Sequence, residues 1–112
     1  MPQTLPKSER LSGLTAVSAL FERGKGLSSG CLRCKYIPTQ ADASRIVVSV
    51  PKRLFKRAVK RNLLKRRIRE AYRRQKGLIS APVDILFIYT APEVLPYEVI
   101  YADMTAILQK IC

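Results

Sequence analysis

The chain has 112 residues, of which 47% are hydrophobic, and it carries a net charge of +13 without a single histidine or tryptophan. This length suits one domain with one core, and the apolar content argues against a disordered chain. No apolar run approaches the ~18 residues of a membrane helix, and the polar N-terminus lacks the apolar stretch of a secretory signal, so we expect a cytoplasmic protein.

The first half of the chain predicts one helix and two strands. Residues 1–12 are rich in proline and polar residues, which indicates a loose N-terminal arm. Apolar residues at helical spacing predict a helix from Gly13 to Arg23, with Ser12 as its N-cap and Gly24 as its stop. The following "KGLSSG" reads as a loop. The alternating "CLRCKYIP" then predicts a strand with a basic face, and after the turn "TQADA" the β-branched "SRIVVSVP" predicts a second strand that Pro51 ends.

The second half predicts a helix, a strand and a helix. The basic segment should be helical from about Lys56 to Gln75, because "GLISAP" supplies a glycine stop and a loop. The apolar run "VDILFIYT" is typical of a strand buried on both faces. After the turn "APEVLP", residues Tyr97 to Ile111 predict a helix with one apolar side. This order of elements predicts a single α+β domain in which helices pack on a small sheet.

The three cysteines do not suggest a metal or redox centre. Cys31 and Cys34 form a lone C-x-x-C pair. A zinc site needs four ligands and, without histidine, only Cys112 could add one. An odd number of cysteines suits a reducing compartment.

The positive charge is concentrated in one segment. Between Lys52 and Lys76 lie 13 of the 21 basic residues and one of the eight acids, which gives this segment +12 and the rest of the chain +1. On a helix Leu64, Ile68 and Ala71, with Tyr72 at the edge, form a narrow apolar stripe that can seat the helix on a sheet. Like charges at i,i+4 repel by a few tenths of a kcal/mol per pair. The excess therefore predicts a strongly negative partner rather than a solvated helix face.

Among negative partners, nucleic acid fits best. A helix that lies on a membrane needs a broad apolar face, whereas this stripe is narrow and would be used in packing. A bZIP-like basic region would continue into leucine heptads, which do not follow Lys76, and helix-turn-helix proteins are usually all-α. RNA is therefore favoured over DNA. A ribosomal or other structural RNA-binding protein and a DNA-binding module stay open as alternatives.

The segment "SRIVVSVPKRLFKRAVKRNLLKRRIREAYR" resembles the protein subunit of bacterial ribonuclease P. The pattern A-V-x-R-N-x-x-K-R-x-x-R-E is matched by Ala58, Val59, Arg61, Asn62, Lys65, Arg66, Arg69 and Glu70, and it follows a strand end at Ser49, Val50, Lys52 and Arg53. Supporting features occur in family order at Arg10, Leu11, Phe21, Gly24, Asp84 and "LPYEVIYADMTAIL", so the resemblance runs from about Arg10 to Ile111. The chain departs from the family at Leu63, where a third basic residue is usual, at the bulky "FKR" before A-V, at Val17 and at Thr90.

The resemblance implies a fold and a role. The fold would be one α+β domain over residues 1–112, a small mixed sheet packed with three helices, with a left-handed strand–helix–strand crossover as in the second domain of a ribosomal protein. The role would be to assist a catalytic RNA in removing the 5′ leader from precursor tRNA. The partners would be that RNA and precursor tRNA, with no DNA and no membrane. Cleavage would belong to the RNA and its associated Mg²⁺, with no catalytic residue and no cofactor on the protein. The lack of histidine, the usual acid and base of protein ribonucleases, agrees with this.

Two sets of residues would contact RNA. The basic helix and the loop before it would bind the catalytic RNA through Lys52, Arg53, Lys56, Arg57, Arg61, Asn62, Lys65, Arg66, Arg69 and Arg73. Lys60, Arg67 and Arg74 would form a flank that only adds to the positive field. A cleft between the first helix and the sheet would hold the single-stranded leader, with Phe21, Arg33, Lys35, Tyr36 and Arg45 as candidates because aromatics beside cations stack on bases. The alternatives are core packing for the two aromatics and solubility for the three cations. Asp84 is expected to be structural.

Overall fold

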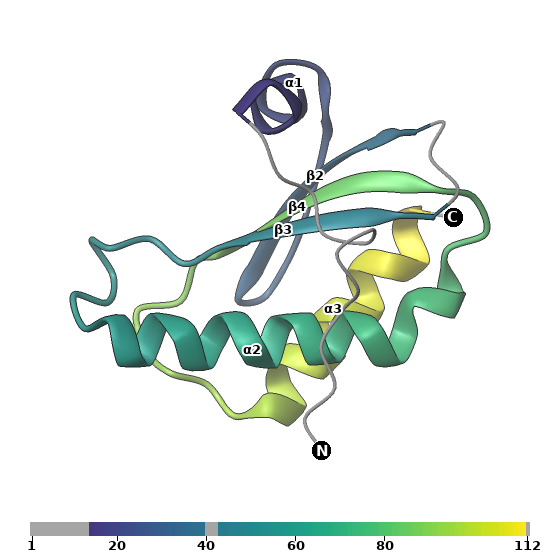
Figure 1. The fold of residues 1–112 in the computed structure, drawn as a ribbon. Helices are drawn as coiled ribbons and strands as arrows, with labels where there is room; N and C mark the ends of the chain where they lie inside the picture. Colours follow the sequence, from purple (N-terminus) through teal and green to yellow (C-terminus); the bar gives the residue numbers. More distant parts are fainter. Residues whose placement is uncertain (1–13, 40–42, 112) are drawn as a thin grey trace.

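A four-stranded mixed sheet with helices on both faces is the frame of the computed structural model, which describes residues 14–39 and 43–111 (Figure 1). The helices are α1 (Leu14–Arg23), α2 (Ala58–Gln75) and α3 (Tyr97–Ile111), with a short 3-10 helix η2 (Lys76–Leu78); the strands are β1 (Lys25–Ser29), β2 (Leu32–Pro38), β3 (Arg45–Ser49) and β4 (Val83–Tyr89). The strand order is β1-β2-β4-β3, with β3 and β4 parallel and the other pairs antiparallel. This architecture confirms the predicted fold class. α2 connects the parallel neighbours β3 and β4, and the left hand of that crossover stays a prediction.

The two faces of the sheet have different covers. α2 and α3 lie on one face and α1 lies on the other (Figure 1). Ile46 of β3 and Phe87 of β4 point to the first face, where they join Ile68 of α2 in the main core. On the second face Leu20 of α1 packs with Leu86 of β4 in a small separate cluster. β4 is thus buried on both faces, as its continuous apolar run predicts.

Most predicted elements are confirmed, and one prediction is wrong. The last helix has the predicted bounds. The basic helix begins two residues later than predicted, because Arg57 still has extended backbone (φ −81°, ψ 125°). The segment "KGLSSG" is not a loop: β1 pairs with β2 along its whole length, from Lys25 opposite Tyr36 to Ser29 opposite Leu32. Several predictions lie outside the described residues, namely the arm 1–12, the Ser12 cap, part of the turn "TQADA", the side chain of Val17 and Cys112.

The hairpin between β1 and β2 is closed by a carboxylate from α3. Gly30 has a positive φ of 53° in this turn. The Asp103 carboxylate accepts hydrogen bonds from the Cys31 backbone N–H at 3.0 Å and from the Ser29 hydroxyl at 3.4 Å. A Cβ at position 30 would lie 2.4 Å from an Asp103 oxygen. Both the backbone angle and the close approach therefore require glycine here.

Replacing Gly30 with alanine should lower the free energy of unfolding by about 2–3 kcal/mol, because it adds backbone strain and displaces Asp103. Urea denaturation measures this loss. Gly26→Ala is the matched control in the same hairpin, since its Cβ would meet nothing closer than the Cys34 carbonyl oxygen at 4.0 Å. Equal losses in the two variants would contradict the role given to Gly30.

Candidate nucleic-acid interface

The apolar stripe of α2 seats the helix on the sheet as predicted. Leu64, Ile68, Ala71 and Tyr72 are fully buried. Gln75 extends this buried side: its Nε2 donates to the Tyr101 carbonyl at 3.1 Å, and its Oε1 accepts from the Thr105 hydroxyl. Because these contacts fix one side of α2 against the sheet and α3, its basic rows face away from the core.

The predicted RNA-contacting residues form one surface over α2 and the loop before it, residues 51–57, here called the cationic loop. Of the ten, seven are exposed and three are half-buried: Lys52, Arg53, Lys56, Arg57, Asn62, Arg66 and Arg69 are exposed, and Arg61, Lys65 and Arg73 are half-buried. The first turn of α2 contains no acid, and Arg57 makes no side-chain cap. The positive end of the helix dipole therefore adds to the charge of the side chains at this end.

Arg61 holds the cationic loop against the helix. Its Nη1 donates to the backbone carbonyls of Phe55 and Lys56, each at 2.9 Å. Phe55 is buried, with its ring centroid 5.8 Å from that of Tyr89, and its N–H bonds the Pro51 carbonyl at 3.3 Å. The guanidinium thus joins loop and helix into one unit. Arg61 was predicted as a direct RNA contact, and its bonds assign it a positioning role as well.

Glu70 forms ion pairs with two arginines near the C-terminal end of α2. Its carboxylate accepts two hydrogen bonds from Arg73, at 2.8 and 2.7 Å, and one from Arg74 at 3.0 Å. These bonds, foremost those from Arg73, lower the pKa of Glu70 from 4.5 to about 2. The stabilisation from the ionised carboxylate is therefore complete above about pH 4.5 and is lost as the pH falls toward 2. Because Glu70 pairs with Arg73 and Arg74, the cations available to a partner lie mainly on the cationic loop and the first half of α2.

Arg67 makes a structural contact in addition to carrying charge. Its Nη1 donates to the Leu95 carbonyl at 2.7 Å. The same loop before α3 is held by Tyr89, whose hydroxyl donates to the Glu93 carbonyl at 2.5 Å and accepts from the Leu95 N–H at 3.1 Å. The expectation that Arg67 only adds to the positive field is therefore corrected.

The face of the sheet next to α1 brings together part of the predicted leader site. Lys35 donates to the Phe21 carbonyl at 2.9 Å, and its Nζ lies 5.7 Å from the Phe21 ring centroid. Phe21 is 51% exposed, so core packing does not account for it. Gly24 ends α1 close to β2: a Cβ there would lie 2.4 Å from the Leu20 carbonyl oxygen of α1 and 3.1 Å from the Lys35 Cβ of β2.

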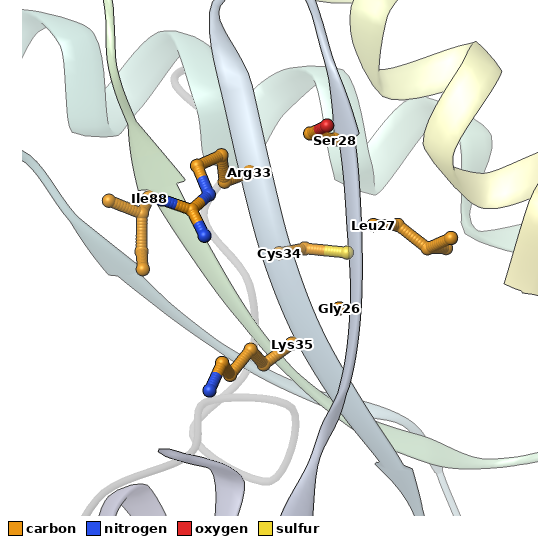
Figure 2. Close-up of a pocket in the computed structure, with 7 residues that line it drawn as sticks. All are labelled: Gly26, Leu27, Ser28, Arg33, Cys34, Lys35 and Ile88. Carbon is orange, nitrogen blue, oxygen red and sulfur yellow. The ribbon is translucent and has the colours of Figure 1, made fainter.

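Beside this aromatic–cation pair lies a hollow of about 290 Å³, here called the β-face hollow. It is lined by Gly26, Leu27, Ser28, Arg33, Cys34, Lys35 and Ile88 (Figure 2). The side chains of Arg33, Lys35 and Ile88 point to one side of the sheet, whereas those of Leu27 and Cys34 point to the other (Figure 2). The sequence pattern does not identify Gly26 and Ser28 as site residues, because it predicts a loop in place of β1. The signal for them is that small residues lie opposite the basic residues of β2, Gly26 opposite Lys35 and Ser28 opposite Arg33.

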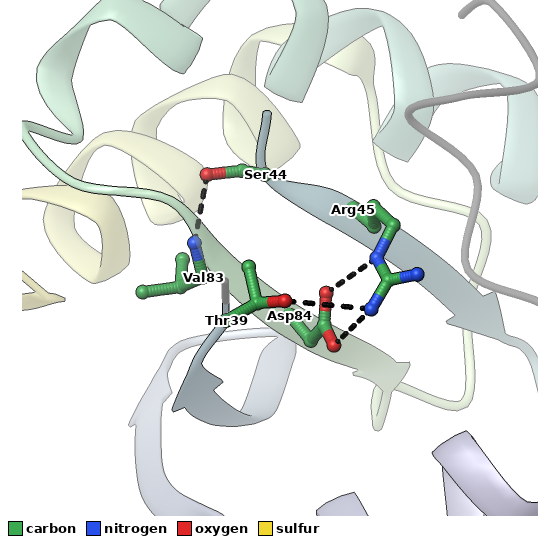
Figure 3. A network of polar contacts seen from close by, with 5 residues as sticks. All are labelled: Thr39, Ser44, Arg45, Val83 and Asp84. Carbon is green, nitrogen blue, oxygen red and sulfur yellow. Dashed lines mark hydrogen bonds and ion pairs between the residues drawn. The ribbon is translucent and has the colours of Figure 1, made fainter. Parts of the chain in front are cut away.

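The Arg45 guanidinium forms an ion pair with Asp84 within the sheet. Its Nε and Nη2 donate to the two carboxylate oxygens of Asp84 at 2.9 and 2.8 Å, and Nη2 also reaches the Thr39 hydroxyl at 3.4 Å (Figure 3). Asp84 is 7% exposed and faces Arg45 across the parallel β3–β4 pair. The structural role expected for Asp84 is confirmed, and Arg45 is its partner.

Tyr36 lies apart from the other leader candidates. It pairs with Ile85 across β2 and β4 and packs against the main core, on the face covered by α2 and α3. Phe21, Arg33 and Lys35 lie on the opposite face. The core-packing alternative accounts for Tyr36, so the proposed leader site does not include it.

The two described cysteines are buried and free. Burial, and secondly a hydrogen bond with Asp103, raises the pKa of Cys31 to about 12, and burial raises the pKa of Cys34 to about 11. Both thiols are thus protonated at neutral pH. Within residues 14–39 and 43–111 no three Cys, Asp or Glu side chains come together as metal ligands. None of the helices in this part of the chain is long and apolar enough to span a membrane.

Comparison with known proteins gives consistent matches. The family model described as Ribonuclease P matches residues 5–112. The chain is 43% identical over 79 residues to the ribonuclease P protein component of Porphyromonas gingivalis, covering 68% of this chain and 58% of that protein. It is 41% identical over 86 residues to the component from Petrotoga mobilis, covering 77% and 72%. In the Porphyromonas case the match thus spans less than two thirds of the relative's length.

Solved structures have the same fold. The ribonuclease P protein from Thermotoga maritima superposes with a TM-score of 0.82 at 28% identity, covering 93% of this chain and 98% of that one. The Staphylococcus aureus protein also gives 0.82, covering 93% and 95%, and at 24% identity this likeness concerns the fold alone.

Proposed function

Because this chain belongs to the ribonuclease P protein family, we propose that it is the protein component of a bacterial ribonuclease P and assists a catalytic RNA in removing the 5′ leader from precursor tRNA. Family membership rests on the model that matches residues 5–112 and on relatives above 40% identity. The contacts with each RNA are proposed from the residues of this chain.

The observation that carries the proposal is the placement of two surfaces on opposite faces of one sheet. The cationic loop and the first half of α2 supply exposed cations for the phosphates of the catalytic RNA. The β-face hollow, with the exposed Phe21 ring beside Lys35, offers stacking and charge to a single strand. A protein that only coats RNA needs the first surface and not the second.

We assign the chemistry to the RNA and its associated Mg²⁺. The chain has no histidine to act as acid and base. Three of its six described acids are engaged elsewhere: Asp84 with Arg45, Glu70 with two arginines, and Asp103 with the hairpin. The protein's part is to reduce the repulsion between two polyanions and to position the leader.

The test mixes the purified chain with a bacterial ribonuclease P RNA and precursor tRNA at low magnesium. We expect faster removal of the leader and, for about six phosphate contacts with the catalytic RNA, a log–log salt slope of about −4 to −5. If an RNA that is active at high magnesium is not stimulated, the proposal fails and a purely structural RNA-binding role takes its place. Tighter binding to duplex DNA than to this RNA would indicate the DNA-binding alternative.

A further inference from the structure

The outward side of α2 carries an exposed apolar residue in its first turn, between the cationic loop and the cations of the helix. Val59 is 79% exposed, more than the other large exposed hydrophobics of the described chain, Phe21, Leu78 and Val99. Ile68, nine residues on and so about two and a half turns away, is fully buried against the sheet. Val59 therefore points directly away from the protein.

The neighbours of Val59 on this side are neutral over the next turn. Asn62 and Leu63 follow at i+3 and i+4, with Asn62 exposed and Leu63 half-buried. Together these three residues form the neutral ridge. Exposed cations border it, at Lys56, Lys60 and Arg66. Along the chain, the ridge lies between the exposed cations of the cationic loop and those of the middle of α2, whereas Glu70 engages the arginines of the last turns.

A phosphate is a poor neighbour for this ridge. Covering the Val59 methyl groups with a phosphate would remove water from a charged oxygen without supplying a hydrogen bond in return. The face of a base or a ribose loses little on such contact. Unpaired nucleotides in RNA loops and bulges expose these surfaces, and an Asn amide both donates and accepts, as base edges require.

We infer that the neutral ridge of Val59, Asn62 and Leu63 receives an unpaired nucleotide of the catalytic RNA, while the cations around it bind the flanking phosphates. The inference rests on the proposed function and adds to it a contact that does not depend on charge. It separates recognition of RNA shape, at the ridge, from general attraction to a polyanion, at its borders.

The experiment measures the affinity of the full chain for the catalytic RNA over a range of salt concentrations. Val59→Ser should weaken binding about five- to tenfold with an unchanged salt slope, since it removes apolar contact and no charge. Val99→Ser makes the same change at a 41% exposed position of α3 and should leave affinity unchanged. Lys60→Ala should instead lower the magnitude of the slope by about 1. Thermal unfolding checks that each variant folds.

Mapping of ribose reactivity locates the nucleotide. Wild-type protein should protect one unpaired site of the RNA that Val59→Ser leaves reactive. The inference is overturned if Val59→Ser binds within twofold of wild type, or if it changes the salt slope as Lys60→Ala does. Failure of the wild-type chain to bind this RNA would overturn the proposed function itself, which keeps the two results distinct.

Discussion

Replacing Arg45 with alanine should lower the free energy of unfolding by about 2–3 kcal/mol, because it leaves the Asp84 carboxylate without its charged partner. That carboxylate is 7% exposed and accepts two hydrogen bonds from Arg45. Removing one partner of a buried ion pair leaves the other charge buried without compensation. Because the Arg45 side chain is partly exposed, the loss of stability is smaller than for a fully buried pair. Urea denaturation at neutral pH measures the effect.

Arg33→Ala is the matched control for Arg45. It removes the same charge from the same sheet, but Arg33 is exposed beside the β-face hollow. We expect its stability to stay within about 0.5 kcal/mol of wild type. Equal stability of the Arg45 and Arg33 variants would show that the Arg45–Asp84 pair does not support the sheet. The two variants also separate a loss of fold from a loss of leader binding.

Replacing Arg61 with alanine should weaken binding of the catalytic RNA by roughly tenfold, because the cationic loop would have to be ordered on binding. The wild-type guanidinium bonds two loop carbonyls at 2.9 Å. Lys60→Ala removes an equal charge from an exposed neighbour on α2 and should cost less. Binding titrations at fixed salt compare the two variants.

Limited trypsin digestion tests the cause of that loss in the free protein. The cationic loop contains Lys52, Arg53, Lys56 and Arg57, each a trypsin site. Arg61→Ala should be cleaved there faster than either wild type or Lys60→Ala. If digestion is unchanged while affinity falls, Arg61 acts as a direct phosphate contact and not through the loop.

The sequence predicted the fold where the residue pattern is strong over many positions. The last helix and the apolar stripe of α2 follow from periodicity alone, and both are confirmed. β1 was missed because glycine and serine have low strand propensity. Its pairing is imposed from outside the segment, by β2 and by an Asp103 carboxylate 72 residues beyond Cys31.

The candidate site was also predicted only in part from the sequence. Charge clustering located the exposed cations of the cationic loop and α2, and the i+3 and i+4 spacing of Arg73 and Arg74 from Glu70 was visible in the sequence. The bonds of Arg61 to the preceding loop and of Arg67 to Leu95 were not, since a basic residue in a basic run has no signal that separates a phosphate contact from a backbone clamp. Those roles depend on where the loops fold.

The sheet separates the two proposed RNA-binding surfaces of the protein. The Phe21–Lys35 pair and the β-face hollow lie on the side of the sheet that faces α1. The helix that carries the exposed cations, α2, lies on the opposite side (Figure 1). The two surfaces share no side chain. We therefore expect two nucleic-acid chains to bind the protein simultaneously, and saturation of one surface to leave the affinity of the other unchanged.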